Sequence, residues 1–133
     1  MRLNSLPSSE YVQRVARLQE ELKNNGIDLF LSYSSECESS SSRYLTGFWP
    51  FFDFAVVAVP VEGQAALLTG GPESYEFAKD FSSVPAIFIN PLLVETCAPE
   101  WVPKVTEMDF NEILSKICKK APKKIGIGNW NIF

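Results

Sequence analysis

The sequence contains no histidine. Histidine is the usual general base beside a Ser or Cys nucleophile and the commonest zinc ligand, so Ser-His-Asp and Cys-His catalysis are excluded for this chain. Cysteine is scarce and odd in number: Cys37, Cys97 and Cys118 lie far apart and form no C-x-x-C pair. We interpret them as free thiols, because neither a zinc motif nor a redox motif is present.

The chain also lacks long apolar runs and a basic surface. No run approaches the roughly 18 apolar residues of a membrane span, and residues 1–10 lack the hydrophobic centre of a signal peptide. The net charge of -4 and the pI near 4.9 argue against binding to nucleic acid or anionic membranes. We therefore expect a cytoplasmic protein that forms one domain over residues 1–133.

The densest aromatic cluster and the longest apolar run lie together in residues 43–63, RYLTGFWPFFDFAVVAVPVEG. Residues 54–59 form a β-branched apolar run with no polar face, which predicts a strand buried on both sides. Pro60 and Gly63 exclude a continuous buried helix and predict a turn. Residues 65–69 should then return as the second arm of a hairpin.

Apolar periodicity and breaker residues predict the remaining elements. A helix capped by Ser8 or Ser9 and ended by Gly26 is followed by a strand over 27–33. After the hairpin we predict a helix over 73–81 with Tyr75 or Phe77, Ala78 and Phe81 inward, a strand over 85–90, an irregular connection over 91–105, a helix opened by a Thr106/Asp109 capping box and ended by Pro122, and a strand over 124–128. This order predicts an α/β fold, a three-layer domain with a mixed sheet of roughly five to six strands flanked by helices.

Two short segments carry polar groups that suggest binding sites. Residues 34–42, SSECESSSS, predict an exposed mobile loop, although Glu36, Cys37 and Glu38 allow a metal site as an alternative. Gly70 and Gly71 precede a helix, and two interpretations of this turn remain open: a phosphate-binding turn and a plain strand-to-helix turn. Without a following Lys and Ser or Thr, the plain turn is preferred.

Carboxylates and aromatics are the remaining candidates for function. A two-metal nuclease would need several converging carboxylates, and only Asp28 and Asp53 lie near predicted strands. Asp53 is instead expected to be hydrogen-bonded at a strand end or paired with a cation such as Arg43. An arginine beside many aromatics is the composition of an interface hot spot, with core packing as the alternative; the residues are Arg43, Tyr44, Phe48, Trp49, Phe51 and Phe52.

Four motifs in this order carry a family resemblance: LKNNGIDLFL, RYLTGF, AVVAVPVEGQAALLTGGPE and KIGIGNWNIF. Together they resemble the N-terminal domain of the creatinase, prolidase and Xaa-Pro aminopeptidase family over nearly the whole chain. The resemblance implies a ribonuclease-H-like α/β motif without nuclease chemistry. The sequence departs from the family in the Ser-rich segment, where Glu36 and Glu38 replace an expected Asn.

The resemblance implies a non-catalytic N-terminal domain of an Xaa-Pro dipeptidase- or aminopeptidase-like hydrolase. Catalysis in the family resides in a later pita-bread domain whose two Asp, one His and two Glu bind two divalent metal ions (Mn, Co or Zn), so no catalytic or metal residue is carried over and the chain alone should be inactive. Dimer contacts and part of the neighbouring subunit's active-site wall are implied for Arg43, Tyr44, Phe48 and Trp49. The expected partners are the protein's own C-terminal catalytic domain and a second copy in a homodimer. A creatinase-like C–N hydrolase and a free-standing interaction module remain alternatives.

Overall fold

The computed structural model describes residues 6–94 and 108–128. These residues form a five-stranded sheet with the strand order β4-β3-β2-β1-β5. The β1–β2 and β2–β3 pairs are antiparallel, whereas β1–β5 and β3–β4 are parallel. The elements in chain order are α1 (Ser8–Asn24), β1 (Leu29–Ser34), α2 (Ser40–Thr46), β2 (Ala55–Pro60), β3 (Ala66–Thr69), α3 (Pro72–Phe81), β4 (Ala86–Ile89), the 3-10 helix η1 (Pro91–Leu93), α4 (Phe110–Ile117) and β5 (Ile125–Gly128).

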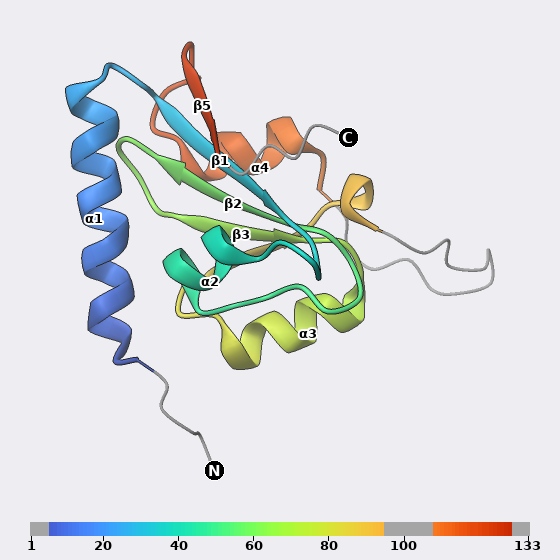
Figure 1. Ribbon diagram of the computed structural model, residues 1–133. Helices are drawn as coiled ribbons and strands as arrows, with labels where there is room; N and C mark the ends of the chain where they lie inside the picture. Colours follow the sequence, from blue (N-terminus) through green and yellow to red (C-terminus); the bar gives the residue numbers. More distant parts are fainter. Residues whose placement is uncertain (1–5, 95–107, 129–133) are drawn as a thin grey trace.

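Strand β2 lies at the centre of the sheet and is buried on both faces. Val57 and Val59 contribute to the core between the sheet and helices α1, α2 and α3. Ala58 faces the opposite core, in which Ile113 and Ile117 of α4 pack. Figure 1 shows the resulting layers, with α4 behind the sheet and helices α1, α2 and α3 around its opposite face. The predicted three-layer fold, buried strand and hairpin are confirmed.

Helix α1 forms as predicted, but its capping differs. Leu22 is buried, and Val15 and Leu18 pack against the same core, so the apolar residues at helical spacing face the sheet. Gly26 follows with φ of 62°, a left-handed conformation that suits glycine. The prediction that Ser8 or Ser9 caps the helix is wrong: Pro7 is the N-cap residue, and both serines lie inside the first turn.

Helix α4 also begins and ends at different residues from those predicted. Its capping box is formed by Asp109 and Glu112, whose side chains each accept the other's backbone N–H, at 2.8 and 3.0 Å. The predicted partner Thr106 lies outside the described residues. The helix ends at Ile117, before the predicted stop at Pro122.

The predicted loop over residues 34–42 is correct only over residues 35–39, because Ser34 is the last residue of β1. Residues 40–42 are the first turn of α2, and the side chains of Ser34 and Ser42 are fully buried. Glu38 accepts hydrogen bonds from the backbone N–H and the hydroxyl of Ser40, and these bonds lower the pKa of the Glu38 carboxyl. A carboxylate before the helix thus satisfies an N-terminal N–H group that would otherwise lack an intrahelical partner.

The β2–β3 connection touches helix α4 through a glycine. Gly63 has φ of 141°, and a Cβ there would lie 2.1 Å from the carbonyl oxygen of Ile117. We predict that Gly63→Ala lowers the free energy of unfolding by about 1–3 kcal/mol, because strain and steric overlap both act against the native backbone. Gly126→Ala is the control, since its Cβ would meet Ile27 Cγ2 at 3.4 Å. Equal losses in urea unfolding for the two variants would contradict this prediction.

Asp28 joins the starts of β1 and β5. Its Oδ2 accepts the backbone N–H groups of Lys123 and Lys124, both at 2.8 Å. These bonds lower the pKa of Asp28 from its ordinary value of 3.8. A lowered folded-state pKa means that the unfolded chain binds the proton more tightly, so the stabilisation is present above the unfolded pKa and is lost as the pH falls through the folded pKa.

We therefore predict that Asp28→Asn destabilises the protein at neutral pH, and that the difference from the wild type vanishes at strongly acid pH. Urea unfolding at a series of pH values measures this difference. Glu20→Gln, at an exposed position on α1, serves as the charge-matched control. A wild-type to Asp28→Asn difference that stays constant from neutral to acid pH would rule out this linkage.

Candidate functional site

Helix α2 and the loop after it, residues 47–54, carry the residues expected to make contacts. Leu45 and Thr46 of α2 are buried against the sheet, which leaves Arg43 and Tyr44 exposed on the outer side. Gly47 ends the helix in the left-handed conformation with φ of 78°. We call residues 47–54 the α2–β2 loop.

The structure separates the four expected residues. Arg43 lies over the ring of Trp49, with 5.5 Å between the guanidinium carbon and the ring centroid. Tyr44 is 52% exposed and is contacted by Arg14 of α1, which lies 4.4 Å from the ring centroid and donates a hydrogen bond to the Tyr44 carbonyl at 3.0 Å. Phe48 is fully buried and packs in the core, so its side chain offers no surface for a partner.

Aromatic side chains connect the α2–β2 loop to helix α3. Trp49 lies 5.6 Å from Phe77 and 5.5 Å from Phe81, measured between ring centroids. The prediction that Phe81 points inward is wrong: it is 48% exposed, and its ring packs against Trp49 at the end of the helix. Phe77 does pack against the core as predicted.

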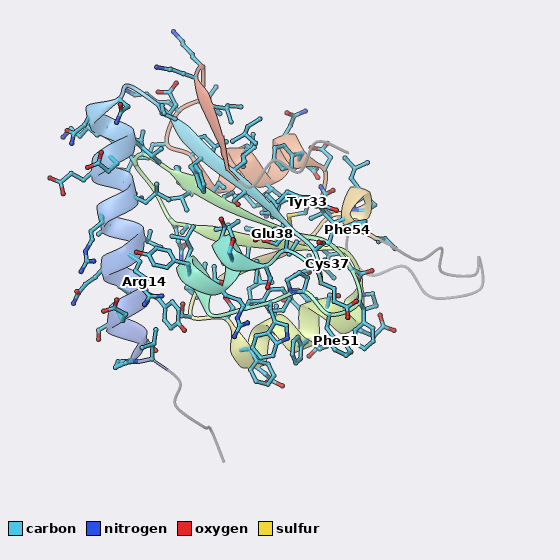
Figure 2. The ribbon with its side chains drawn as sticks, in the orientation of Figure 1. Arg14, Tyr33, Cys37, Glu38, Phe51 and Phe54 are labelled. Atoms are coloured by element: carbon cyan, nitrogen blue, oxygen red, sulfur yellow. The ribbon has the colours of Figure 1, made fainter. Side chains whose placement is uncertain are left out.

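Phe51 and Phe52 form a second aromatic contact, on the same loop. Their rings meet edge to face at 4.7 Å, and the side chains are 52% and 56% exposed. In Figure 2, Phe51 lies beside α3, well apart from Arg14 on α1. We call the side chains of Arg43, Trp49, Phe51, Phe52 and Phe81 the aromatic surface. Sequence reasoning missed Phe81 and Arg14, and no pattern indicated that Arg14 would stack on Tyr44.

Asp53, near the end of this loop, has a buried carboxylate. It is 5% exposed, and its Oδ2 accepts hydrogen bonds from the Gly71 backbone N–H at 2.7 Å and from Ser74 Oγ at 2.8 Å. The predicted hydrogen bonding of Asp53 is confirmed. Gly71 is the N-cap residue of α3, so the glycine turn considered for phosphate receives an anionic group from the chain itself.

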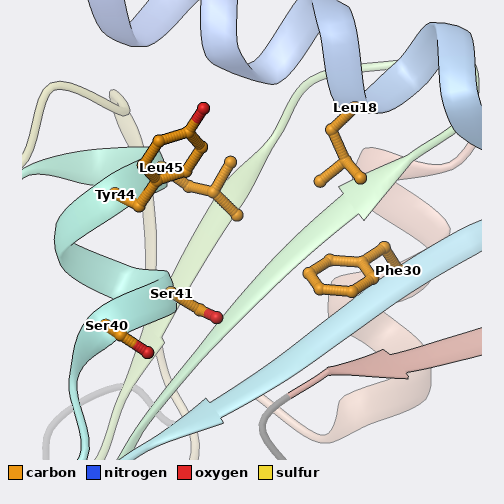
Figure 3. A pocket seen from close by; sticks show the side chains of 6 residues that line it. All are labelled: Leu18, Phe30, Ser40, Ser41, Tyr44 and Leu45. Carbon is orange, nitrogen blue, oxygen red and sulfur yellow. The ribbon is translucent and has the colours of Figure 1, made fainter.

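A hollow of about 420 Å³ lies between α1, β1 and α2. Leu18, Phe30, Tyr44 and Leu45 give it an apolar wall, and Ser40 and Ser41 line its remaining side. Figure 3 shows these six side chains converging from the three elements. The hollow lies on the Tyr44 side of α2 and does not include the residues of the aromatic surface.

The described residues contain no cluster of three or more His, Cys, Asp or Glu side chains that could hold a metal ion. Cys37 is exposed and Cys118 is half-buried, and burial raises the pKa of the Cys118 thiol. Cys97 lies outside the described residues. Within residues 6–94 and 108–128, none of the helices combines the length and apolar character required to cross a lipid bilayer.

Comparison with known proteins supplies the family. A proline dipeptidase from Streptococcus agalactiae is similar in structure, with a TM-score of 0.58 and 19% identity over 90% of this chain and 80% of that one. Dipeptidase PepE from Mycobacterium ulcerans has a TM-score of 0.53 and 16% identity over 72% of this chain. The prolidase from Pyrococcus horikoshii has a TM-score of 0.50 and 19% identity over 86% of this chain. At these identities the likeness concerns the fold.

The chain spans 25% of the Mycobacterium dipeptidase and 32% of the Pyrococcus prolidase. No curated protein matches the sequence. The model of the Creatinase/Prolidase N-terminal domain family matches residues 14–132. This match covers most of the sequence and agrees with the mixed sheet and its flanking helices, so the chain belongs to the Creatinase/Prolidase N-terminal domain family.

Proposed function

We propose that this chain is the non-catalytic N-terminal domain of an Xaa-Pro dipeptidase- or aminopeptidase-like hydrolase, and that it provides dimer contacts and part of the wall of the neighbouring subunit's active site. The observation that carries the proposal is the aromatic surface on a domain of this family. The proteins of similar structure are described as a proline dipeptidase, a dipeptidase and a prolidase, which favours peptidase over creatinase chemistry.

The composition of the aromatic surface supports a contact role. Exposed aromatic side chains with an arginine are enriched at the centres of protein interfaces, because they bury a large area with few rotatable bonds. Arg43 adds a planar guanidinium group, which can bind a carboxylate through two parallel hydrogen bonds. The guanidinium already lies over the Trp49 ring, which holds it at the surface without burying its charge.

The chemistry is assigned to a second domain that follows this chain. Two divalent metal ions held there would activate the attacking water, and this domain would contribute surface and shape only. The reading frame beyond Phe133 should therefore encode the spaced Asp, Asp, His, Glu and Glu ligands. A frame that continues without them would favour the creatinase-like alternative, and one that stops would favour an interaction module.

The purified chain should not hydrolyse an Xaa-Pro dipeptide when Mn²⁺ or Co²⁺ is added, because the proposal places the metal ligands in another domain. Release of free proline, followed by amino-acid analysis, measures this. A prolidase of known activity in the same buffer is the positive control. Robust metal-dependent turnover by the chain alone would overturn the assignment of catalysis to another domain.

In the protein encoded by the complete reading frame, we predict that Arg43→Ala weakens dimerisation or raises KM by about tenfold, as expected for an arginine at an interface hot spot. Lys79→Ala is the matched control, since Lys79 is also an exposed cation over an aromatic ring, 5.0 Å from the centroid of Tyr75. Sedimentation velocity and steady-state kinetics measure the two effects. If the two variants have the same dimerisation and the same KM, Arg43 does not take part in the contact.

A further inference from the structure

The first turn of α2 carries mainly small polar side chains. Ser39 is the N-cap residue of the helix, and residues 40–42 are serines as well, so this turn brings no apolar side chain to the sheet. The apolar anchor of α2 is Leu45, which lies in the last turn and packs in the core. Because apolar burial is the dominant favourable term in folding, the first turn of α2 gains less from packing than the last.

Two serines of β1 lie on the face of the sheet that α2 covers. Ser32 and Ser34 alternate along the strand in step with Phe30, which packs against the same core as Leu45 of α2. Both serine side chains are fully buried, and neither Oγ has a hydrogen-bond partner in the described part of the chain. A buried hydroxyl without a partner disfavours the folded form, because it has lost its hydrogen bonds to water.

The two ends of α2 are held differently. At the C-terminal end, the Thr46 carbonyl accepts hydrogen bonds from the backbone N–H of Ser83 at 2.7 Å and from its Oγ at 3.0 Å. At the N-terminal end, Ser40 and Ser41 border the hollow of about 420 Å³, as Figure 3 shows. A side chain that faces a hollow lacks packing partners on that side, so the first turn is the less firmly held end.

Arg14 of α1 attaches the middle of α2. It donates a hydrogen bond to the Tyr44 carbonyl at 3.0 Å, and its guanidinium carbon lies 4.4 Å from the centroid of the Tyr44 ring. Glu10, one turn earlier in α1, pairs with Arg14 at 3.0 Å and orients its guanidinium. Arg14 thus joins the two helices through a single side chain near the surface, and this contact can break without disturbing the core.

We propose that the first turn of α2 is a strap that opens locally from the sheet while the C-terminal end of the helix stays attached, and that Arg14 is its latch. Opening lets water reach the hydroxyls of Ser32 and Ser34, which offsets the contacts that are lost. Arg43 and Tyr44 move with this turn, so opening withdraws them from the proposed contact. That consequence rests on the proposed function, whereas the opening rests on the geometry of this chain.

Native-state hydrogen exchange tests the opening. The backbone N–H groups of residues 43–45 should exchange about tenfold faster than those of residues 57–59 in β2, with little dependence on low concentrations of urea. The Arg43 N–H, for example, donates to the Ser39 carbonyl at 2.9 Å and is protected only while the turn is closed. If both segments exchange at the same rate and with the same urea dependence, α2 opens only by global unfolding and the proposal is overturned.

Serine variants test the cause of the opening. Ser32→Ala and Ser34→Ala remove the unpartnered hydroxyls, and each should slow exchange in residues 43–45 by about tenfold. Ser42→Ala is the matched control, because Ser42 is equally buried but its Oγ donates to the Ser39 carbonyl at 3.0 Å. It should not slow exchange. If Ser32→Ala and Ser34→Ala leave exchange unchanged or accelerate it, the buried hydroxyls do not favour opening and the proposal is overturned.

Arginine variants test the latch. Arg14→Gln should accelerate exchange in residues 43–45 by about tenfold, since it removes both the charged hydrogen bond and the contact with the Tyr44 ring. Arg17→Gln is the matched control, because Arg17 is an exposed arginine of α1 that donates to Gln13 of the same helix at 3.5 Å. Equal exchange in the two variants would overturn the role of Arg14. These rates are measured without substrate, so they hold or fail independently of the proposed function.

Discussion

The fold depends on the burial of β2 on both faces. Because successive side chains of a strand point in opposite directions, Val57 and Val59 pack against one layer of helices and Ala58 packs against the other. The two neighbouring strands pair with β2 in antiparallel register, and the two outer strands are added in parallel. Both helix layers of the domain therefore pack against this one strand.

Among the described residues, carboxylates accept backbone N–H groups at the starts of four elements. Asp28 bonds the start of β5, Glu38 the start of α2, Asp53 the start of α3, and Asp109 the start of α4. Such groups lack partners within their own elements, and an anion suits the positive end of a helix dipole. Asp28 and Asp53, considered as nuclease ligands, and Glu38, considered as a metal ligand, thus have a structural use.

The domain divides into a packed interior and one distinctive outer region. The α2–β2 loop takes part in both, since Phe48 is fully buried while the neighbouring Trp49 is partly exposed and the following Phe51 and Phe52 lie largely at the surface. This division suits the contact role that we propose for the domain. It also places the proposed contact on a segment that is held at both ends, and fixed geometry lowers the entropic cost of association.

The sequence by itself determined the strands, the hairpin, helix α1 and the mixed three-layer sheet, because apolar periodicity and breaker residues act over short distances along the chain. It did not determine α2, which has seven residues; a helix so short forms through tertiary packing rather than propensity. Nor could composition decide which aromatics are buried. The hydrogen bonds that Arg14 donates to Tyr44 and that the Gly71 N–H donates to Asp53 span 30 and 18 positions, and only the folded chain brings such groups together.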